Sequence, residues 1–146
     1  AEARGTIIGI TRGTEKGHIA RATLDALAAQ VASLTDLMQV DSGLPLAELR
    51  VDGGAARNDL LMQIQADLTG VPVARSSQLE TTAYGAAMLA AVGAGLLPSL
   101  DKVAERWSAD RVFEPAISAD QRESRMRIWR DAVTRSRGWA GVIADH

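Results

Sequence analysis

The clearest pattern along the chain is a set of apolar positions that recur at helical spacing between residues 15 and 40. They follow one another at steps of 4, 3, 4, 3 and 4 and comprise Ala20, Leu24, Leu27, Val31, Leu34 and Met38. A second, smooth side is formed by Ala22, Ala26 and Ala29. Thr14 is a suitable N-cap, and Gly43 with Pro45 ends the pattern. The spacing therefore predicts one long helix over 15–40.

Short strands alternate with helices in the next part of the chain. Residues 48–52 alternate between apolar and polar and end on a pair of glycines, which predicts a strand closed by a turn. A helical period runs over 57–70, and residues 71–74 are typical of a second short strand. The next helix, 82–92, consists almost entirely of small residues, so we expect another element to lie very close to it. This βαβα order predicts a parallel sheet.

The last part of the chain adds helices and one extended segment. The pattern predicts a short helix over 97–107, an extended segment over 111–115 and a helix over 118–136 that opens on a capping box. One face of the last helix carries Met126, Trp129 and Val133. The whole pattern predicts a helix-rich α/β fold with a short parallel sheet. Two or three strands are few for a self-sufficient domain, so we expect the sheet to be incomplete.

Composition and charge narrow the classes of function. The chain has 146 residues, the length of one domain or of part of one. Basic and acidic residues nearly balance, at 16 and 18, which argues against a nucleic-acid binder. The lack of cysteine excludes thiolate metal sites, and no apolar run approaches the ~20 residues of a membrane span. We expect a soluble, cytoplasmic protein, and the start at Ala1, inside what reads as a domain, suggests a truncated chain.

The most informative candidate site is the connection between residues 48–52 and the helix that follows. Gly53 and Gly54 allow positive φ angles and a close approach of a ligand to the backbone. The helix start offers unpaired N–H groups, and Asn58 carries the donor and acceptor needed to read a purine edge. These residues fit a nucleotide site, although the spacing matches neither the Walker nor the dinucleotide pattern. A tight turn capped by Asn58 is the alternative that the spacing leaves open.

Other polar residues indicate structural roles rather than chemistry. His18 has no nearby nucleophile or second metal ligand, and Asp52 has no partner carboxylate at a suitable spacing. The glycine-punctuated run 5–14 contains Arg12, but an arginine in a loop is more often solvated than bound to phosphate. The final helix is rich in arginine with acidic residues between, which is typical of a solvated or partner-contacting face. We identify no catalytic residue and no metal ligand.

Several motifs together resemble one known family. The pattern GxIxGI from Gly5, then seven residues and HIxxATLD from His18, matches the second signature of the FGGY carbohydrate kinases at every constrained position. Further similar segments follow in order: VDGG at 51–54, LMQIQAD at 61–67, GVPV at 70–73 and ETTAYGAA at 80–87. The resemblance extends from Ala3 to about Trp139. Within the family, the string over 3–14 is similar to members that phosphorylate glycerol rather than xylulose or gluconate.

The resemblance implies a two-domain enzyme of the actin-like ATPase (ribonuclease H-like) fold, which transfers the γ-phosphoryl group of ATP to the terminal hydroxyl of glycerol. Residues 1–146 would be the distal part of its C-terminal nucleotide-binding domain, with the N-terminal domain absent. By the same resemblance, Gly53, Gly54 and Asn58 match the adenosine-binding motif. The catalytic aspartate, the Mg²⁺ ligands and the glycerol pocket are expected upstream, so we do not expect the chain alone to catalyse the transfer.

Two positions depart from the family pattern, and two other functions stay open. Arg57 and Asp59 replace a small residue and a second asparagine, so we expect a charge pair at the adenine rim. The same region of another FGGY sugar kinase, such as a xylulose kinase, is the related alternative. The alternative from a different class is a non-catalytic interaction module, in which the long apolar helix and the arginine-rich last helix serve a partner or a homo-oligomer.

Overall fold

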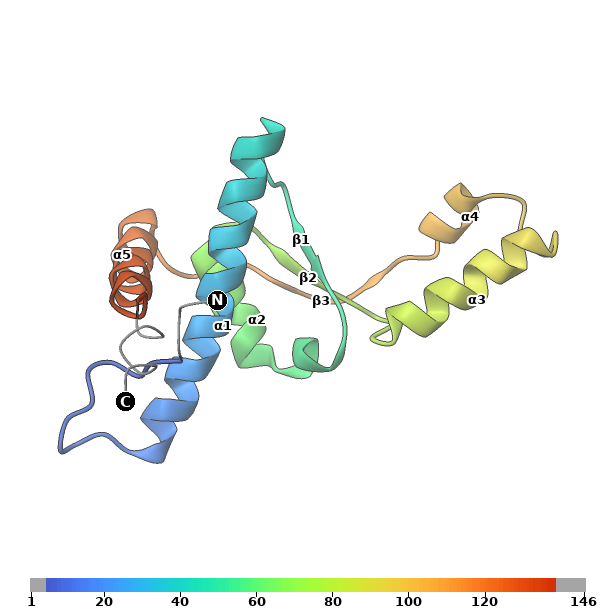
Figure 1. Cartoon of the computed structure of the whole chain (residues 1–146). Coiled ribbons are helices and arrows are strands. Elements are labelled where there is room, and N and C mark those ends of the chain that lie inside the picture. The colour runs from blue at the N-terminus through green and yellow to red at the C-terminus, as the bar shows by residue number, and fades with distance from the viewer. Residues whose placement is uncertain (1–4, 139–146) are drawn as a thin grey trace.

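The computed structural model describes residues 5–138 (Figure 1). The family resemblance begins at Ala3 and ends at Trp139, so both of these residues lie outside the described part. The elements in chain order are α1 (Lys16–Ser42), β1 (Leu49–Val51), the 3₁₀ turn η1 (Gly54–Arg57), α2 (Asp59–Thr69), β2 (Val73–Ser76), α3 (Thr81–Gly93), α4 (Leu100–Ala104), β3 (Ala109–Phe113) and α5 (Ala119–Arg135). The predicted helices and strands are confirmed, with ends shifted by a few residues.

The three strands form a small mixed sheet in the order β1-β2-β3. β1 and β2 are parallel, as predicted, because α2 crosses between them, and Leu49 pairs with Val73. β3 is antiparallel to β2, so the expectation of a wholly parallel sheet is wrong for the third strand. The reason lies where the connection begins and ends: the Ser77 amide donates to the Ser108 carbonyl at 3.0 Å, and the two hydroxyl oxygens are 2.8 Å apart. Because the two ends of the segment between β2 and β3 lie side by side, β3 runs back along β2 in the opposite direction.

α2 is the central helix, because it contacts the sheet as well as α1 and α5 (Figure 1). The buried cluster around it includes Leu61, Met62, Ile64 and Leu68 of α2, Val73 and Phe113 of the sheet and Met126 of α5. Leu49, Val73 and Phe113 are paired across the strands, so one face of the sheet forms the floor of this core. We call α1, α2, α5 and the sheet the packed unit.

α1 turns its alanines, rather than its leucine stripe, toward the core. Ala28, Ala29 and Ala32 are buried, and their small side chains let α1 approach α2 closely. The apolar stripe that the spacing reveals is largely exposed, with Leu34 at 58% and Met38 at 60%. α1 therefore presents a broad apolar surface that the described residues do not cover.

α5 packs against both α1 and the end of α2. Met126 is buried and the Trp129 indole N–H donates to the Ser33 hydroxyl at 3.1 Å, which confirms the predicted apolar face. Gly70 ends α2 with φ +74°, and Arg122 donates to the last carbonyl of that helix at 2.9 Å. A Cβ at Gly70 would lie 2.1 Å from the Arg122 guanidinium. The positive φ requires glycine at this junction, and a larger residue would also displace the Arg122 side chain from its hydrogen bond.

Residues 77–108 form an arm that projects away from the packed unit (Figure 1). Within it α3 contacts α4, but no residue of α3 is buried. This helix carries no charged side chain and is rich in alanine. The prediction that another element lies very close to its small residues is wrong within residues 5–138, since only α4 contacts α3 extensively and no residue of α3 is buried.

Candidate functional site

The three predicted site residues lie together on the connection between β1 and α2. Gly53 has φ +80° and ψ 178°, a backbone conformation that is essentially restricted to glycine. Its amide donates to the Leu79 carbonyl at 3.0 Å, and its carbonyl accepts from the Ala56 amide at 3.2 Å. The glycine at position 53 is therefore needed by the turn itself, whether or not a ligand binds there.

Gly54 and Ala55 make the exposed face of this connection. A methyl group at Gly54 would meet no atom within 4 Å, and the φ of Gly54 is one that other residues adopt. Among residues 5–138 the amides of Gly54 and Ala55 donate no hydrogen bond. Open space beside the backbone and free N–H donors are what a ligand needs to contact the main chain.

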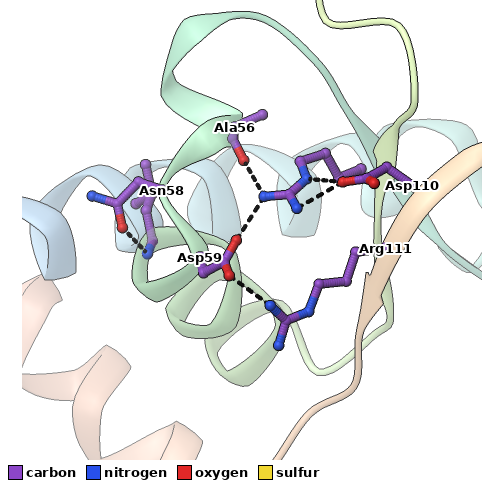
Figure 2. Close-up of polar contacts among 7 residues, drawn as sticks. Ala56, Asn58, Asp59, Asp110 and Arg111 are labelled. Atoms are coloured by element: carbon purple, nitrogen blue, oxygen red, sulfur yellow. Dashed lines mark hydrogen bonds and ion pairs between the residues drawn. The ribbon is translucent and has the colours of Figure 1, made fainter.

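Asn58 ends η1 and caps α2. Its side-chain oxygen accepts from the Leu61 amide at 3.1 Å, so the capping role that the sequence left open is confirmed (Figure 2). The residue is exposed, and its side-chain nitrogen donates to no other residue within the described part. The side-chain oxygen of Asn58 thus caps the helix, and the side-chain nitrogen stays available to a ligand.

A cluster of ion pairs ties this connection to the sheet (Figure 2). We call it the Arg75 cluster, and it comprises Asp59, Arg75, Asp110 and Arg111. Arg75 donates from Nη1 to Asp59 at 2.6 Å and to the Ala56 carbonyl at 3.2 Å. Its Nε and Nη2 donate to the same oxygen of Asp110, at 2.9 and 2.7 Å. Arg111 donates to the other oxygen of Asp59 at 2.5 Å.

Arg75 is the most enclosed member of the cluster. Its side chain is 13% exposed, whereas those of Asp59 and Asp110 are about half exposed, at 52% and 53%. The hydrogen bond with Asp59, and next the one with Asp110, raise the pKa of the Arg75 guanidinium. The stabilisation linked to a raised arginine pKa is present at neutral pH and is lost as the pH rises through that pKa. The cluster therefore keeps its cation throughout the neutral range.

The Arg75 cluster also corrects an expectation about Arg57 and Asp59. No ion pair joins these two residues, because the Asp59 carboxylate points to the arginines of the sheet and Arg57 is exposed. Sequence reasoning missed Arg75. The available signal was its place two residues after Val73, which puts an arginine on the inward side of a strand.

The other polar residues singled out in the sequence have structural roles, or make no contact that indicates a function. The Glu15 amide donates to His18 Nδ1 at 3.0 Å, which confirms a structural histidine at the start of α1. Thr14 does not cap α1, since its hydroxyl accepts from the Thr11 amide. Arg12 is exposed, as predicted, and the run around it contains no strand. Within residues 5–138 no hydrogen bond joins Asp52 to the glycine turn.

Two further observations concern the surface and the ligand chemistry of residues 5–138. An open hollow of about 430 Å³ lies within the arm, next to the end of β2, and is lined in part by Gln78, Tyr84 and Trp107. None of the three predicted site residues lines it. No group of three His, Asp or Glu side chains suited to a metal ion is found in this part of the chain. No helix there is long and apolar enough to cross a membrane.

The comparisons with known proteins agree with the motifs. The model of the FGGY family of carbohydrate kinases, C-terminal domain, matches residues 1–94. A glycerol kinase from Bordetella parapertussis is 59% identical over 144 residues, which are 99% of this chain and 28% of that protein. One from Deinococcus radiodurans is 56% identical over 139 residues, again 28% of its length. The chain thus spans little more than a quarter of the curated relatives it matches.

Solved structures give the same assignment for the fold. The structure of Plasmodium falciparum glycerol kinase with ADP has 34% identity and a TM-score of 0.81, over 92% of this chain and 27% of that one. A ligand-bound xylulose kinase from Lactobacillus acidophilus, at 23% identity and a TM-score of 0.77 over 94% of this chain and 29% of that one, shares the fold. The expected actin-like ATPase fold is confirmed. By its family match over well more than half of its length, the chain belongs to the FGGY family of carbohydrate kinases.

Proposed function

We propose that this chain is the nucleotide-binding C-terminal part of an ATP-dependent glycerol kinase. The observation that carries the proposal is the 59% identity to a glycerol kinase across 99% of the chain. Identity to the xylulose kinase with the same fold is only 23%, so another sugar kinase of the family is the weaker alternative. Such an enzyme acts in the cytoplasm, where ATP and glycerol meet.

The proposal places residues 1–146 in the distal part of a larger C-terminal domain. Its support is the apolar surface that the described residues leave open. The leucine stripe of α1 is exposed, and α3 has no polar face and no buried residue. Leu89, on α3, is 60% exposed and Leu34, on α1, is 58% exposed. Helices of this kind are stable when more protein packs on them.

In this function Gly53, Gly54 and Asn58 hold the adenosine part of ATP. The residues fit such a ligand: Gly54 leaves space beside the backbone, two amides have no partner among the described residues, and Asn58 keeps a free side-chain nitrogen. A relative at 34% identity was crystallised with ADP. Bound ATP would supply the phosphoryl group for the terminal hydroxyl of glycerol. The role of these residues is to bind and orient the nucleotide.

Mg²⁺ and the catalytic base belong elsewhere in the proposed enzyme. No group of three His, Asp or Glu side chains suited to a metal ion is found among residues 5–138. Mg²⁺ in phosphoryl-transfer enzymes is commonly held by one or two carboxylates together with the nucleotide phosphates, and we propose that those carboxylates lie in the rest of the protein. We therefore assign no catalytic residue and no metal ligand to the described residues and expect no kinase activity from the chain alone. Glycerol is the proposed substrate of the complete protein.

Gly54→Ala tests the nucleotide site without disturbing the fold. The added methyl enters open space at an ordinary φ, so the variant should unfold at the same temperature as the parent. In the full-length protein we expect the Kd for ADP, measured by calorimetry, to rise about tenfold, because the methyl occupies the space a nucleotide would enter. Gly93→Ala makes the same change at the end of α3 and should leave the Kd unchanged. Equal Kd values for Gly54→Ala and the parent would contradict the site.

A substrate comparison tests the activity. The full-length protein with ATP and Mg²⁺ should phosphorylate glycerol with a higher kcat/KM than xylulose or gluconate. A preference for a ketopentose would replace glycerol by that sugar and leave the nucleotide site untouched. Phosphorylation of none of these substrates, together with a stable homo-oligomer in sedimentation, would favour an interaction module that uses the exposed face of α1.

A further inference from the structure

The placement of Arg75 is unusual for a charged side chain. Side chains alternate along a strand, so Arg75 shares the core-facing side of β2 with Val73, which is fully buried. Its partners in the register are Val51 on β1 and Arg111 on β3. Two arginines thus lie side by side on neighbouring strands, an arrangement that costs free energy unless an anion lies between them.

Two aspartates from different elements supply that anion. Asp59 is the first residue of α2 and accepts from both arginines, one on each carboxylate oxygen. Asp110 lies on β3 where the register shifts between Arg75 and Ser76, so it is the extra residue of a bulge. A bulge redirects side chains. Here it brings the Asp110 carboxylate onto the Nε and Nη2 edge of Arg75.

The remaining hydrogen bond of the guanidinium goes to the candidate site. Arg75 Nη1 donates to the carbonyl of Ala56, a residue 19 positions earlier in the chain. Ala56 lies between Gly54 and Asn58 in η1, and it is 2% exposed. Arg75 is therefore the side chain that joins the sheet directly to the main chain of the turn. Arg111 pairs with Asp59 but makes no contact with that carbonyl.

We propose that Arg75 is a positioning residue for nucleotide binding: by holding the Ala56 carbonyl and Asp59 against the sheet, it fixes the Gly53–Asn58 turn in the shape that receives the ligand. This inference rests on the proposed function of that turn. An arginine is suited to the task because its planar fork serves Asp59, Asp110 and the carbonyl at once. Lysine carries its three donors on one nitrogen atom, so it lacks the spread fork that reaches groups on different sides of the guanidinium.

The test uses Arg75→Lys in the full-length protein, with Arg111→Lys as the matched control. Arg75→Lys keeps a cation between the two aspartates but loses the simultaneous hold on the Ala56 carbonyl. We expect the Kd for ADP and the KM for ATP to rise about tenfold, with kcat at saturating ATP and the KM for glycerol changed by less than about twofold. Arg111→Lys should leave the nucleotide constants within about twofold of the parent.

A second variant serves if Arg75→Lys does not fold. Asp110→Asn keeps the shape of the side chain and removes the charge that orients Arg75, so we expect a smaller rise, of about threefold, in the same nucleotide constants. The Kd for ADP of every variant is compared with that of Gly54→Ala, which enters the turn directly.

Each remaining result decides against the proposal. If Gly54→Ala weakens ADP binding while Arg75→Lys and Asp110→Asn do not, the site stands and the positioning role is wrong. If Arg111→Lys weakens binding as much as Arg75→Lys, the effect is one of general charge. If Arg75→Lys raises the KM values for ATP and glycerol alike and lowers Tm, its role is only structural. If Gly54→Ala itself has no effect, the site is wrong and the positioning role falls with it.

Discussion

α2 and α3 flank the same strand, β2, yet they have opposite environments. α2 spans 11 residues and most of them are buried, whereas α3 spans 13 residues and none is buried. Composition does not explain the difference, since α3 is the more apolar of the two and carries no charge. α2 is buried because the sheet, α1 and α5 surround it, while α3 contacts only α4 extensively.

The comparison shows that the sequence of a helix gives its apolar pattern, whereas the elements packed around it determine how much of it is buried. The sequence of α2 mixes apolar and polar positions, the pattern of a helix with one solvent side, yet its neighbours also bury the polar residues Gln65, Asp67 and Thr69. α3 is apolar all round, a pattern that fits burial on every side. The prediction of a close neighbour for α3 was therefore physically reasonable, and the neighbour is not among residues 5–138. In the proposed kinase the rest of the domain supplies it.

The largest effect expected from this comparison comes from a matched leucine truncation. Leu61 on α2 is 4% exposed and Leu89 on α3 is 60% exposed. In this chain, Leu61→Ala should lower the free energy of unfolding by about 3 kcal/mol, because it leaves a cavity in the core. Leu89→Ala should lower it by less than about 0.5 kcal/mol. Urea denaturation followed by far-UV circular dichroism measures both.

The same two substitutions, made in the full-length protein, test whether the rest of the domain covers α3. If the rest of the domain covers α3, Leu89→Ala should now cost about 2 kcal/mol or more, close to the cost of Leu61→Ala. A cost for Leu89→Ala that stays below about 0.5 kcal/mol in both settings would mean that the arm is exposed in the complete protein.

A smaller effect is expected where a buried carboxylate joins α2 to the loop before α5. Asp67 is 8% exposed and accepts from the Ala116 amide at 2.8 Å and from the Gln63 side chain at 3.0 Å. Asp67→Ala should cost about 2 kcal/mol, because the Ala116 amide loses its acceptor. Asp67→Asn keeps an oxygen at that place and should cost less.

The arm offers the matching polar control. Lys102 and Glu105 on the arm form an ion pair in which both side chains are more than half exposed. Glu105→Gln should change the free energy of unfolding by less than about 0.5 kcal/mol. Equal costs for Asp67→Ala and Glu105→Gln in the same urea titration would contradict the division into a packed unit and an exposed arm.

Local rules explain why most elements could be predicted. Helix spacing, the glycine pair and the capping box act over a few residues, so the long helix, the turn at Gly53 and the last helix follow from the sequence. The direction of β3 does not follow, because it depends on Ser77 and Ser108 meeting across the whole arm. The side of α1 that faces the core was equally hidden, since both its leucines and its alanines form continuous stripes.

The candidate site likewise has one part that the sequence predicts and one part that it does not. Gly53, Gly54 and Asn58 are neighbours in the chain, so a strand-turn-helix pattern was enough to find them. The Arg75 cluster joins Asp59, Arg75 and Asp110 from three elements and depends on a bulge in β3. No spacing in a sequence reveals a bulge that forms between strands about thirty-five residues apart in the chain.

The smallest expected effect concerns Gly85 in the middle of α3, where the sign of the change distinguishes two environments. A methyl group at Gly85 would meet no atom within 4 Å. In this chain, Gly85→Ala should stabilise α3 by up to about 1 kcal/mol through helix propensity, and slow amide hydrogen exchange in that helix by about fivefold. In the full-length protein, a neighbour packed on the glycine would reverse the sign, because an inserted methyl costs about 1 kcal/mol or more in a packed interface.

Ala87→Gly, two residues on, should destabilise α3 in both settings and so reports propensity alone. Stabilisation by Gly85→Ala in both settings would show that the small residues of α3 serve no close packing, and the arm would then differ from α2 in the complete protein as it does here.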